Sequence, residues 1–183
     1  MTGNGSTGST TDAVADSVGA PGVEENLRSV TGVVVGDDGS AASRDAVLWA
    51  AEDAARRGAP LHVVRCWQMT TAPQPGSWKV GYIPPLEDWE QAVIRELDAA
   101  WASLRDRVPE LRLHAVHGRP GRVLVEASRD ADLVVVGSRG HGRLADLVLG
   151  SVATDVAREA QCPVVIVRPR TDRPGEDDAT RAG

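Results

Sequence analysis

The feature that most constrains the fold lies between residues 132 and 160, where a buried strand is followed by closely spaced glycines and a new helix. The strand is the apolar, β-branched run Leu133–Val136, whose composition is typical of a strand inside a sheet. The glycines that follow it are Gly137, Gly140, Gly142 and Gly150. From Ser151 onward the apolar residues recur at helical spacing. The segment therefore predicts a strand, a glycine-rich loop and a helix in direct succession.

This succession is suited to holding an anion. Glycines permit left-handed turns that aim backbone N–H groups inward, and the lack of a Cβ lets the backbone approach a phosphate closely. The start of a helix adds roughly half a positive charge at the same place. Ser151 can cap that helix or donate its hydroxyl to an oxygen. The glycines alone leave an ordinary capped turn open as the alternative.

The composition favours a parallel α/β protein. Of the 183 residues, 42% are hydrophobic, 3% are aromatic and none is Phe, so the core must consist of Val, Leu, Ala and Ile, as in parallel sheets. The net charge of −6 offers no general attraction for nucleic acids or anionic membranes, and we expect neither as a partner. The sequence shows neither an apolar run of about 20 residues nor a signal peptide. We therefore expect a cytoplasmic protein.

The predicted elements alternate between strand and helix. We expect strands at residues 30–35, 61–67, 111–116, 133–136 and 163–167. We expect helices at about 40–57, 86–108, 121–129 and 151–160. This alternation predicts a five-stranded parallel sheet with helices on both faces, in which ligands bind at the carboxyl ends of the strands. The folded domain is expected to cover residues 29–169, between disordered tails at 1–28 and 170–183.

The connection at residues 68–85 is rich in Pro and Gly and predicts no helix or strand of its own. A loop of this length in a compact domain is expected to be a functional flap or a locally mobile segment. The helix after it carries Trp89 and Trp101 at helical spacing, and we interpret both as core residues rather than as residues that stack on a ligand.

Two common nucleotide-binding motifs, the Walker A sequence and the dinucleotide pattern GxGxxG, are absent. His114 and His117 point to opposite faces of a predicted strand, which argues against a metal pair. His62 and His117 are expected at strand ends or on the surface. His141, in the glycine loop, is the histidine we would test for chemistry.

Three segments together resemble the universal stress protein family, in its ATP-binding, single-domain form. They are VVVGDDGSAAS at residues 33–43, the spacing G-x2-G-x9-G-[ST] from Gly137 to Ser151, and CPVVIVRP at residues 162–169. The resemblance covers about residues 30–169. It implies a Rossmann-like sheet of the adenine-nucleotide-binding α/β type, and a non-enzymatic regulatory protein of the stress response that binds ATP.

The resemblance also implies site residues. Asp38 would approach the ribose or a divalent ion, Mg²⁺ or Mn²⁺, and the backbone of Cys66 would contact adenine. The complete implied nucleotide site is Gly36, Asp37, Asp38, Ser40, Cys66, Gly137, Ser138, Arg139, Gly140, His141, Gly142, Arg143, Gly150, Ser151, Val152 and Ala153. The last strand, Val164 to Val167, would pair with its twin in a homodimer.

One departure from the family pattern concerns Asp37, which stands where a small apolar residue is usual. If its carboxylate faced the ligand beside Asp38, it would repel a triphosphate and favour AMP or cAMP; neighbours at a strand end point to opposite faces, so it can also face away. Two other functions stay open: a slow Mg²⁺-dependent ATPase that uses Asp38, and a dimeric interaction module with a weak or empty pocket.

Overall fold

The computed structural model describes residues 27, 30–140 and 149–169. The predicted tails lie outside the described residues, with the exception of Leu27. This side chain is 5% exposed and belongs to the hydrophobic core, so the packed unit begins before the predicted boundary at residue 29.

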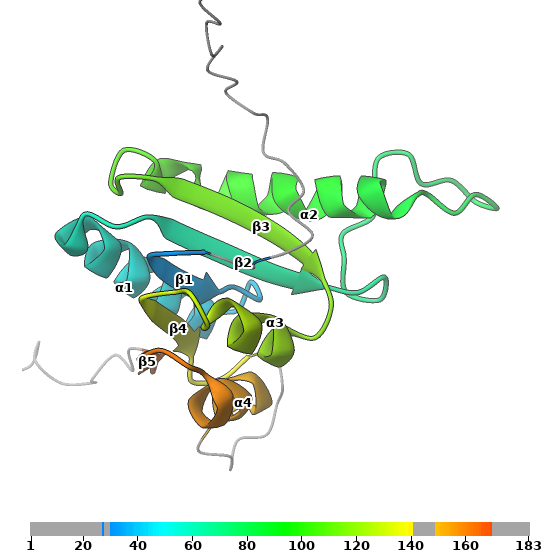
Figure 1. Cartoon of the computed structure of the whole chain (residues 1–183). Helices are drawn as coiled ribbons and strands as arrows, with labels where there is room; N and C mark the ends of the chain where they lie inside the picture. The colour runs from blue at the N-terminus through cyan, green and yellow to red at the C-terminus, as the bar shows by residue number, and fades with distance from the viewer. Residues whose placement is uncertain (1–26, 28–29, 141–148, 170–183) are drawn as a thin grey trace, which may run out of the picture.

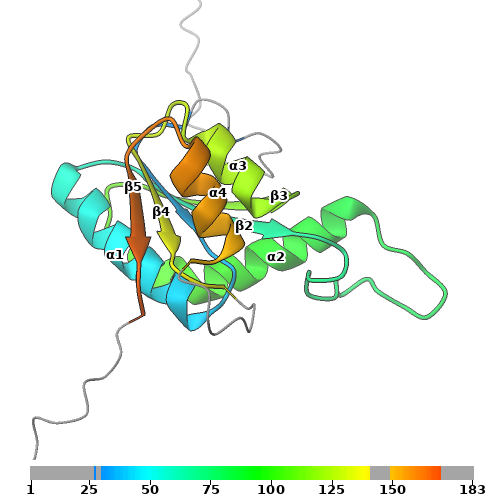
Figure 2. The same ribbon diagram turned by 90° about the horizontal axis from the view of Figure 1, so that it is seen from below.

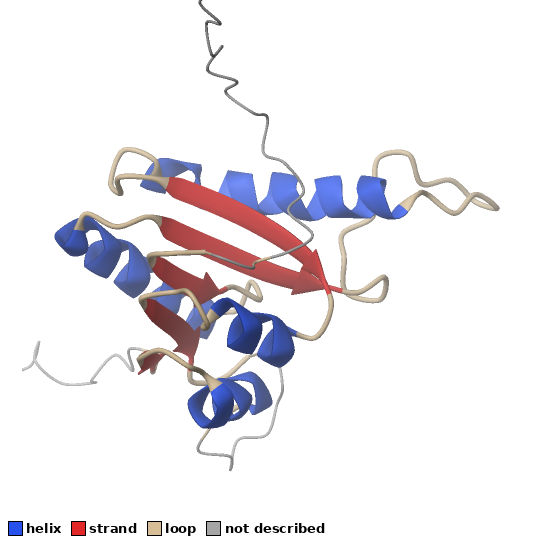
Figure 3. Ribbon diagram, viewed as in Figure 1, coloured by secondary structure: helices blue, strands red, loops and turns tan. Residues whose placement is uncertain are grey.

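The described chain forms the predicted alternation of strands and helices. In chain order the elements are β1 (Val33–Gly36), α1 (Ala41–Arg57), β2 (Leu61–Trp67), α2 (Leu86–Trp101), the 3₁₀ turn η1 (Ala102–Leu104), β3 (Leu111–His117), α3 (Pro120–Ala127), β4 (Leu133–Gly137), α4 (Ser151–Glu159) and β5 (Val164–Val167). The strands make one parallel sheet in the order β3-β2-β1-β4-β5, as Figures 1 and 3 show. The predicted fold class is confirmed.

The helices cover both faces of the sheet. In Figure 2, α1 and α2 lie on one side of the strands, and α3 and α4 lie on the other. Alternate strand residues enter the two layers: Leu61 and Val63 of β2 join the core under α1 and α2, whereas Val64 joins the core under α3 and α4. The sheet is therefore buried on both faces, which explains its nearly continuous apolar strands.

The strand order places the switch point of the sheet beside β1. The chain runs outward from β1 to β2 and β3, and then returns to β4 on the other side of β1. The loops that leave β1 and β4 therefore diverge to opposite faces and leave a crevice at their carboxyl ends. Both predicted glycine loops begin at this crevice.

Local chemistry sets the limits of the helices. The hydroxyl of Ser40 accepts a hydrogen bond of 3.1 Å from the backbone N–H of Ser43 and caps α1, while Gly58 ends it with a left-handed φ of 65°. Helix α2 is shorter than the predicted 86–108, because the chain tightens into the 3₁₀ turn after Trp101. The apolar pattern nevertheless continues to Val108, since this residue still packs in the core.

The connection at residues 68–85 extends away from the body of the molecule, beyond the end of β2 and the start of α2 (Figures 1 and 2). Apart from one isolated bridge between Lys79 and Tyr82, it contains no regular strand or helix. Large apolar side chains on this loop are exposed, including Val80 at 91% and Ile83 at 80%. No helix among the described residues is long and apolar enough to cross a membrane.

The structure corrects the placement of one histidine. His62 was expected at a strand end or on the surface, but it is 1% exposed within β2. Its Nδ1 lies 3.0 Å from Nε2 of His114 on β3, and the two rings stack. The pair forms because the parallel register places His114 beside Val64, which lies two positions along β2 from His62 and therefore on the same face of the sheet. His117 is exposed at the end of β3, where its ring contacts Trp67.

Candidate functional site: a crevice at the carboxyl ends of the strands

A cavity of about 350 Å³ opens at the switch point of the sheet, within the size range of small-molecule sites. Its described lining comes from β1 and the loop after it, from β2, and from α3, β4 and the start of α4. The lining residues are Gly36, Asp37, Asp38, Ser43, Val64, Cys66, Pro120, Leu124, Val136, Gly137, Arg139, Gly140, Gly150, Ser151, Val152 and Ala153. The two loops that the sequence singled out thus meet at one site.

The loop after β1 turns sharply so that α1 can begin. Gly39 takes a left-handed φ of 81°, a conformation that glycine adopts without a steric penalty. Asp38 accepts a hydrogen bond of 3.0 Å at Oδ1 from the backbone N–H of Ser40. The Ser40 side chain serves as the cap of α1, and Ser40 does not line the cavity. From this loop Asp37 and Asp38 line the cavity.

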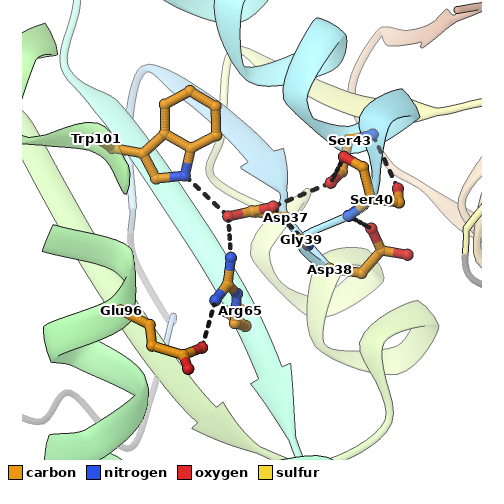
Figure 4. A network of polar contacts seen from close by, with 8 residues as sticks. All are labelled: Asp37, Asp38, Gly39, Ser40, Ser43, Arg65, Glu96 and Trp101. Carbon is orange, nitrogen blue, oxygen red and sulfur yellow. Dashed lines mark hydrogen bonds and ion pairs between the residues drawn. The ribbon is translucent and has the colours of Figure 1, made fainter. Parts of the chain in front are cut away.

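The carboxylate of Asp37 is turned toward the opposite layer of helices (Figure 4). Its Oδ2 lies 2.7 Å from Nη2 of Arg65 and 2.8 Å from Nε1 of Trp101. Arg65 shares a face of β2 with Leu61 and Val63, which pack beneath α1 and α2. Of the two orientations that the sequence left open, the structure therefore shows the one that keeps this charge away from the cavity.

The loop after β4 reaches Asp38 from across the crevice. A Cβ on Gly140 would lie only 2.5 Å from Oδ2 of Asp38, so a larger residue here would displace this carboxylate from its position. Among the described glycines of the loop, Gly137, Gly140 and Gly150 do not have the left-handed φ that the sequence analysis expected. His141, Gly142 and Arg143 lie outside the described residues.

Gly137 has a role in packing. A Cβ at this position would lie 2.9 Å from the carbonyl oxygen of Ala42 in α1, so its absence lets the helix sit directly against β4. At Gly150, in contrast, a Cβ would meet Cα of Arg139 at 3.5 Å, which is an ordinary contact. These two glycines of the motif thus have different structural requirements: close packing demands a glycine at residue 137 but not at residue 150.

The start of α4 forms the wall of the cavity that carries partial positive charge. The backbone N–H of Gly150 donates to the carbonyl of Ser138 at 2.9 Å, and the first intrahelical bond runs from Thr154 to Gly150. The N–H groups of Ser151, Val152 and Ala153 precede that bond, so they have no partner within the helix. Together with the helix dipole they can hold an anion. Gly150 is the N-cap of α4, and no side chain caps the helix, so of the two roles considered for Ser151 the capping of this helix is excluded.

The floor of the cavity is apolar. It consists of Val64 and Cys66 on β2, Val136 on β4, and Pro120 and Leu124 of α3. Burial raises the pKa of the Cys66 thiol to about 12, so this side chain is neutral and behaves as a small apolar group. A flat apolar group, such as a heterocyclic base, can pack on this floor while an attached anion reaches α4.

The sequence-based site differs from the observed cavity in two respects. Ser40 and Ser138 do not line it; Ser138 is buried, and its N–H donates to the carbonyl of Val167. Five lining residues were missed, although the alternation along β2 and the helical spacing of α3 could have indicated some of them: Ser43, Val64, Pro120, Leu124 and Val136. None of residues 68–85 lines the cavity.

The residues present can supply part of the coordination shell of a divalent ion, but they cannot supply the whole shell. Asp38 contributes the carboxylate that approaches Gly140, whereas Asp37 directs both oxygens to other donors. No cluster of three or more His, Cys, Asp or Glu side chains suited to a metal occurs in the part of the chain that the structure describes. This donor set fits Mg²⁺ or Mn²⁺ held jointly by one carboxylate and the phosphates of a ligand.

The solved structures most similar to this fold include two that contain adenine nucleotides. A universal stress protein described in complex with cAMP is 30% identical, with a TM-score of 0.55, and the alignment covers 76% of this chain and 98% of that chain. A universal stress protein from Archaeoglobus fulgidus described in complex with dAMP is 27% identical, with a TM-score of 0.51 and coverage of 76% and 98%.

The sequence comparisons agree with the structural ones. A universal stress protein of Mycobacterium tuberculosis is 38% identical over 145 residues, which are 79% of this chain and 51% of the relative. One from Mycolicibacterium smegmatis is 37% identical over 147 residues, or 75% of this chain and 46% of the relative. The chain thus spans about half the length of these relatives. The model of the universal stress protein family matches residues 31–168, and the chain belongs to this family.

Proposed function

We propose that the chain is an adenine-nucleotide-binding regulatory protein of the stress response, with ATP as its ligand. The observation that carries this proposal is the cavity, in which an apolar floor lies next to N–H groups at the start of α4 that have no partner within the helix. A nucleotide has the matching shape and polarity: a flat base and an anionic phosphate chain joined by a sugar. The cAMP and dAMP complexes of relatives support the adenine base.

Each part of the ligand has a candidate partner. The base would rest on Val64, Leu124 and the backbone of Cys66, because these form the apolar floor. The ribose or a bound Mg²⁺ would meet Asp38 at the mouth. The phosphates would meet the N–H groups of Ser151, Val152 and Ala153, with Arg139 of the β4 loop beside them. The orientation of Asp37 removes the repulsion that would otherwise disfavour a triphosphate.

We further propose that binding occurs without a dedicated reaction. Asp38 is the carboxylate turned toward the cavity among its described lining residues, and Cys66 is held as a neutral thiol. Phosphoryl transfer at a useful rate requires a positioned nucleophile in addition to a bound metal. We therefore expect ATP hydrolysis at a slow background rate, and equal rates in the native protein and in Asp38→Ala at matched nucleotide occupancy would agree with this expectation.

The test is to purify the protein without added nucleotide, denature it and identify released small molecules by chromatography and mass. Titration calorimetry of the emptied protein with ATP, AMP and cAMP, each with Mg²⁺, then ranks the ligands. Tightest binding of ATP is the expected result. Tighter binding of AMP or cAMP would overturn ATP as the ligand while retaining the adenine site. No release and no heat with any of the three would overturn the proposal and favour the interaction module.

We also propose a homodimer that forms through β5. Val164–Val167 is the last strand of the sheet, pairs only with β4 among the described strands, and has four half-buried residues. An open strand edge presents unpaired N–H and C=O groups, and pairing with a second copy would satisfy them. Sedimentation at several protein concentrations tests this proposal, which a monomer at all concentrations would contradict.

A further inference from the structure

The site contains a buried carboxylate that does not face the ligand cavity, and this group is Asp37. The residue is 4% exposed, and its two oxygens accept four hydrogen bonds (Figure 4). Oδ1 accepts from the N–H of Gly39 at 2.8 Å and from the hydroxyl of Ser43 at 3.0 Å. Oδ2 accepts from Arg65 at 2.7 Å and from Trp101 at 2.8 Å. These partners come from the β1 loop, α1, β2 and α2.

Burial of a charge is unfavourable unless the charge is paired and its hydrogen bonds are made. Asp37 meets both conditions, because Arg65 is only 16% exposed and two donors serve each oxygen. Four donors around the carboxylate fix the side chain of Asp37 in one orientation. Asp37 therefore anchors the end of β1 to both helices of the layer behind the sheet.

The anchor acts on the next residue in the chain, Asp38. Asp37 fixes the backbone before Asp38 through its own side chain, and it fixes the backbone after Asp38 through the N–H of Gly39. Between these two points Asp38 is held facing Gly140, with Oδ2 at the place where a Cβ of residue 140 would clash. The direction of this carboxylate into the cavity mouth thus depends on contacts made on the other face of the sheet.

We propose that Asp37 is the positioning residue of the nucleotide site, which holds Asp38 in the orientation that meets the ribose or its metal ion. This inference rests on the proposed function. It assigns a role to a residue that departs from the usual family pattern. It also makes α2 part of the site, since Trp101 donates to Asp37 from the core on the other face of the sheet.

The decisive variant is Asp37→Asn, which keeps the shape of the side chain. The amide has one acceptor oxygen and one NH₂ donor, so whichever way it turns, the NH₂ faces two donors: Gly39 and Ser43, or Arg65 and Trp101. Glu96→Gln is the matched control. Glu96 is 54% exposed and lies 3.3 Å from Arg65 at the outer end of the same network, and an exposed ion pair of this kind has little effect.

The experiment is a double-mutant cycle read by calorimetry with Mg-ATP. Asp37→Asn should weaken binding about tenfold in the native background but less than about twofold in Asp38→Ala. If Asp37 acts by orienting Asp38, it has little left to contribute once the Asp38 carboxylate is removed. Glu96→Gln should bind as the native protein does. An equal loss in both backgrounds, or no loss in either, would overturn the role.

A second measurement needs no nucleotide. Amide hydrogen exchange of the Gly39 N–H should be faster in Asp37→Asn than in Glu96→Gln, since its acceptor is lost or replaced. Unchanged exchange overturns the inference even if the native protein binds no adenine nucleotide, an outcome that by itself refutes only the proposed function. If Asp37→Asn does not fold, Trp101→Phe removes a single donor and retains the ring, and it should give the same changes with smaller amplitude.

Discussion

Acidification should destabilise the folded protein through its buried histidine pair. His114 is 3% exposed and lies against His62. Burial, and then the charges of His62 and Arg112, lower the pKa of His114 from 6.5 to about 3. An unfolded His takes up a proton near pH 6.5, whereas folded His114 stays neutral until about pH 3. The unfolded state therefore binds more protons between these values, and stability falls as the pH is lowered through this window.

The size of the effect follows from the width of the window. Each pH unit below the unfolded pKa costs about 1.4 kcal/mol, so a decrease from about pH 8 to about pH 4.5 should cost about 3 kcal/mol from His114 alone. Domains of this size have total stabilities of about 5–15 kcal/mol, so the change is readily measured by urea unfolding at the two pH values.

The comparison needs two variants, because carboxylates also titrate at acidic pH. His114→Gln removes the buried titrating group, and its loss of stability between the two pH values should be smaller by about 3 kcal/mol. His117→Gln is the matched control, since His117 lies at the exposed end of the same strand; it should show the native loss. The reasoning is refuted if His114→Gln loses as much stability on acidification as the native protein.

Four further substitutions test separate parts of the structure. Gly150→Ala should change the melting temperature by less than about 3 °C, because the added Cβ would make only ordinary contacts. It should weaken Mg-ATP binding at least about tenfold by calorimetry, because Gly150 lines the cavity where α4 begins and the Cβ would take up space proposed for a phosphate. Gly137→Ala, whose Cβ would lie 2.9 Å from the carbonyl oxygen of Ala42, should instead lose about 1–3 kcal/mol of stability, and the opposite pattern would contradict the reasoning for both glycines. Ser40→Ala should cost about 1 kcal/mol in urea unfolding through loss of the α1 cap, and a neutral effect would argue against that bond. If the protein forms the proposed dimer, Ile166→Pro should convert it to a monomer in sedimentation, because it removes a donor from the edge of β5, and a persistent dimer would exclude this edge as the interface.

Much of the fold could be predicted because its signals are local. Apolar β-branched runs identify β2 and β4, which match or nearly match their predicted limits of 61–67 and 133–136. Helical spacing identifies the helices, and their alternation with strands leaves few topologies. The apolar pattern overestimated α2, since a 3₁₀ turn that packs on the sheet has a similar pattern of buried positions.

The two glycine loops of the site could also be predicted, because a parallel sheet brings all strand carboxyl ends to one edge. The structural reason for each glycine could not be predicted from the sequence. Gly137 is required by the approach of the α1 backbone, whereas a Cβ at residue 140 would displace the carboxylate of Asp38, and both neighbours are distant in sequence. The sequence identified glycines at positions where phosphate binding and close packing demand the same residue.

The sequence by itself determined the alternation of elements, the parallel sheet and the edge where a ligand can bind, because hydrophobic periodicity and glycine spacing act over a few residues. Only the tertiary structure decided the direction of Asp37 and the pairing of His62 with His114. Each depends on strand register and on helices that return from distant parts of the chain. A charged or titratable side chain takes its orientation from the donors and burial around it, and those are fixed only when the layers pack.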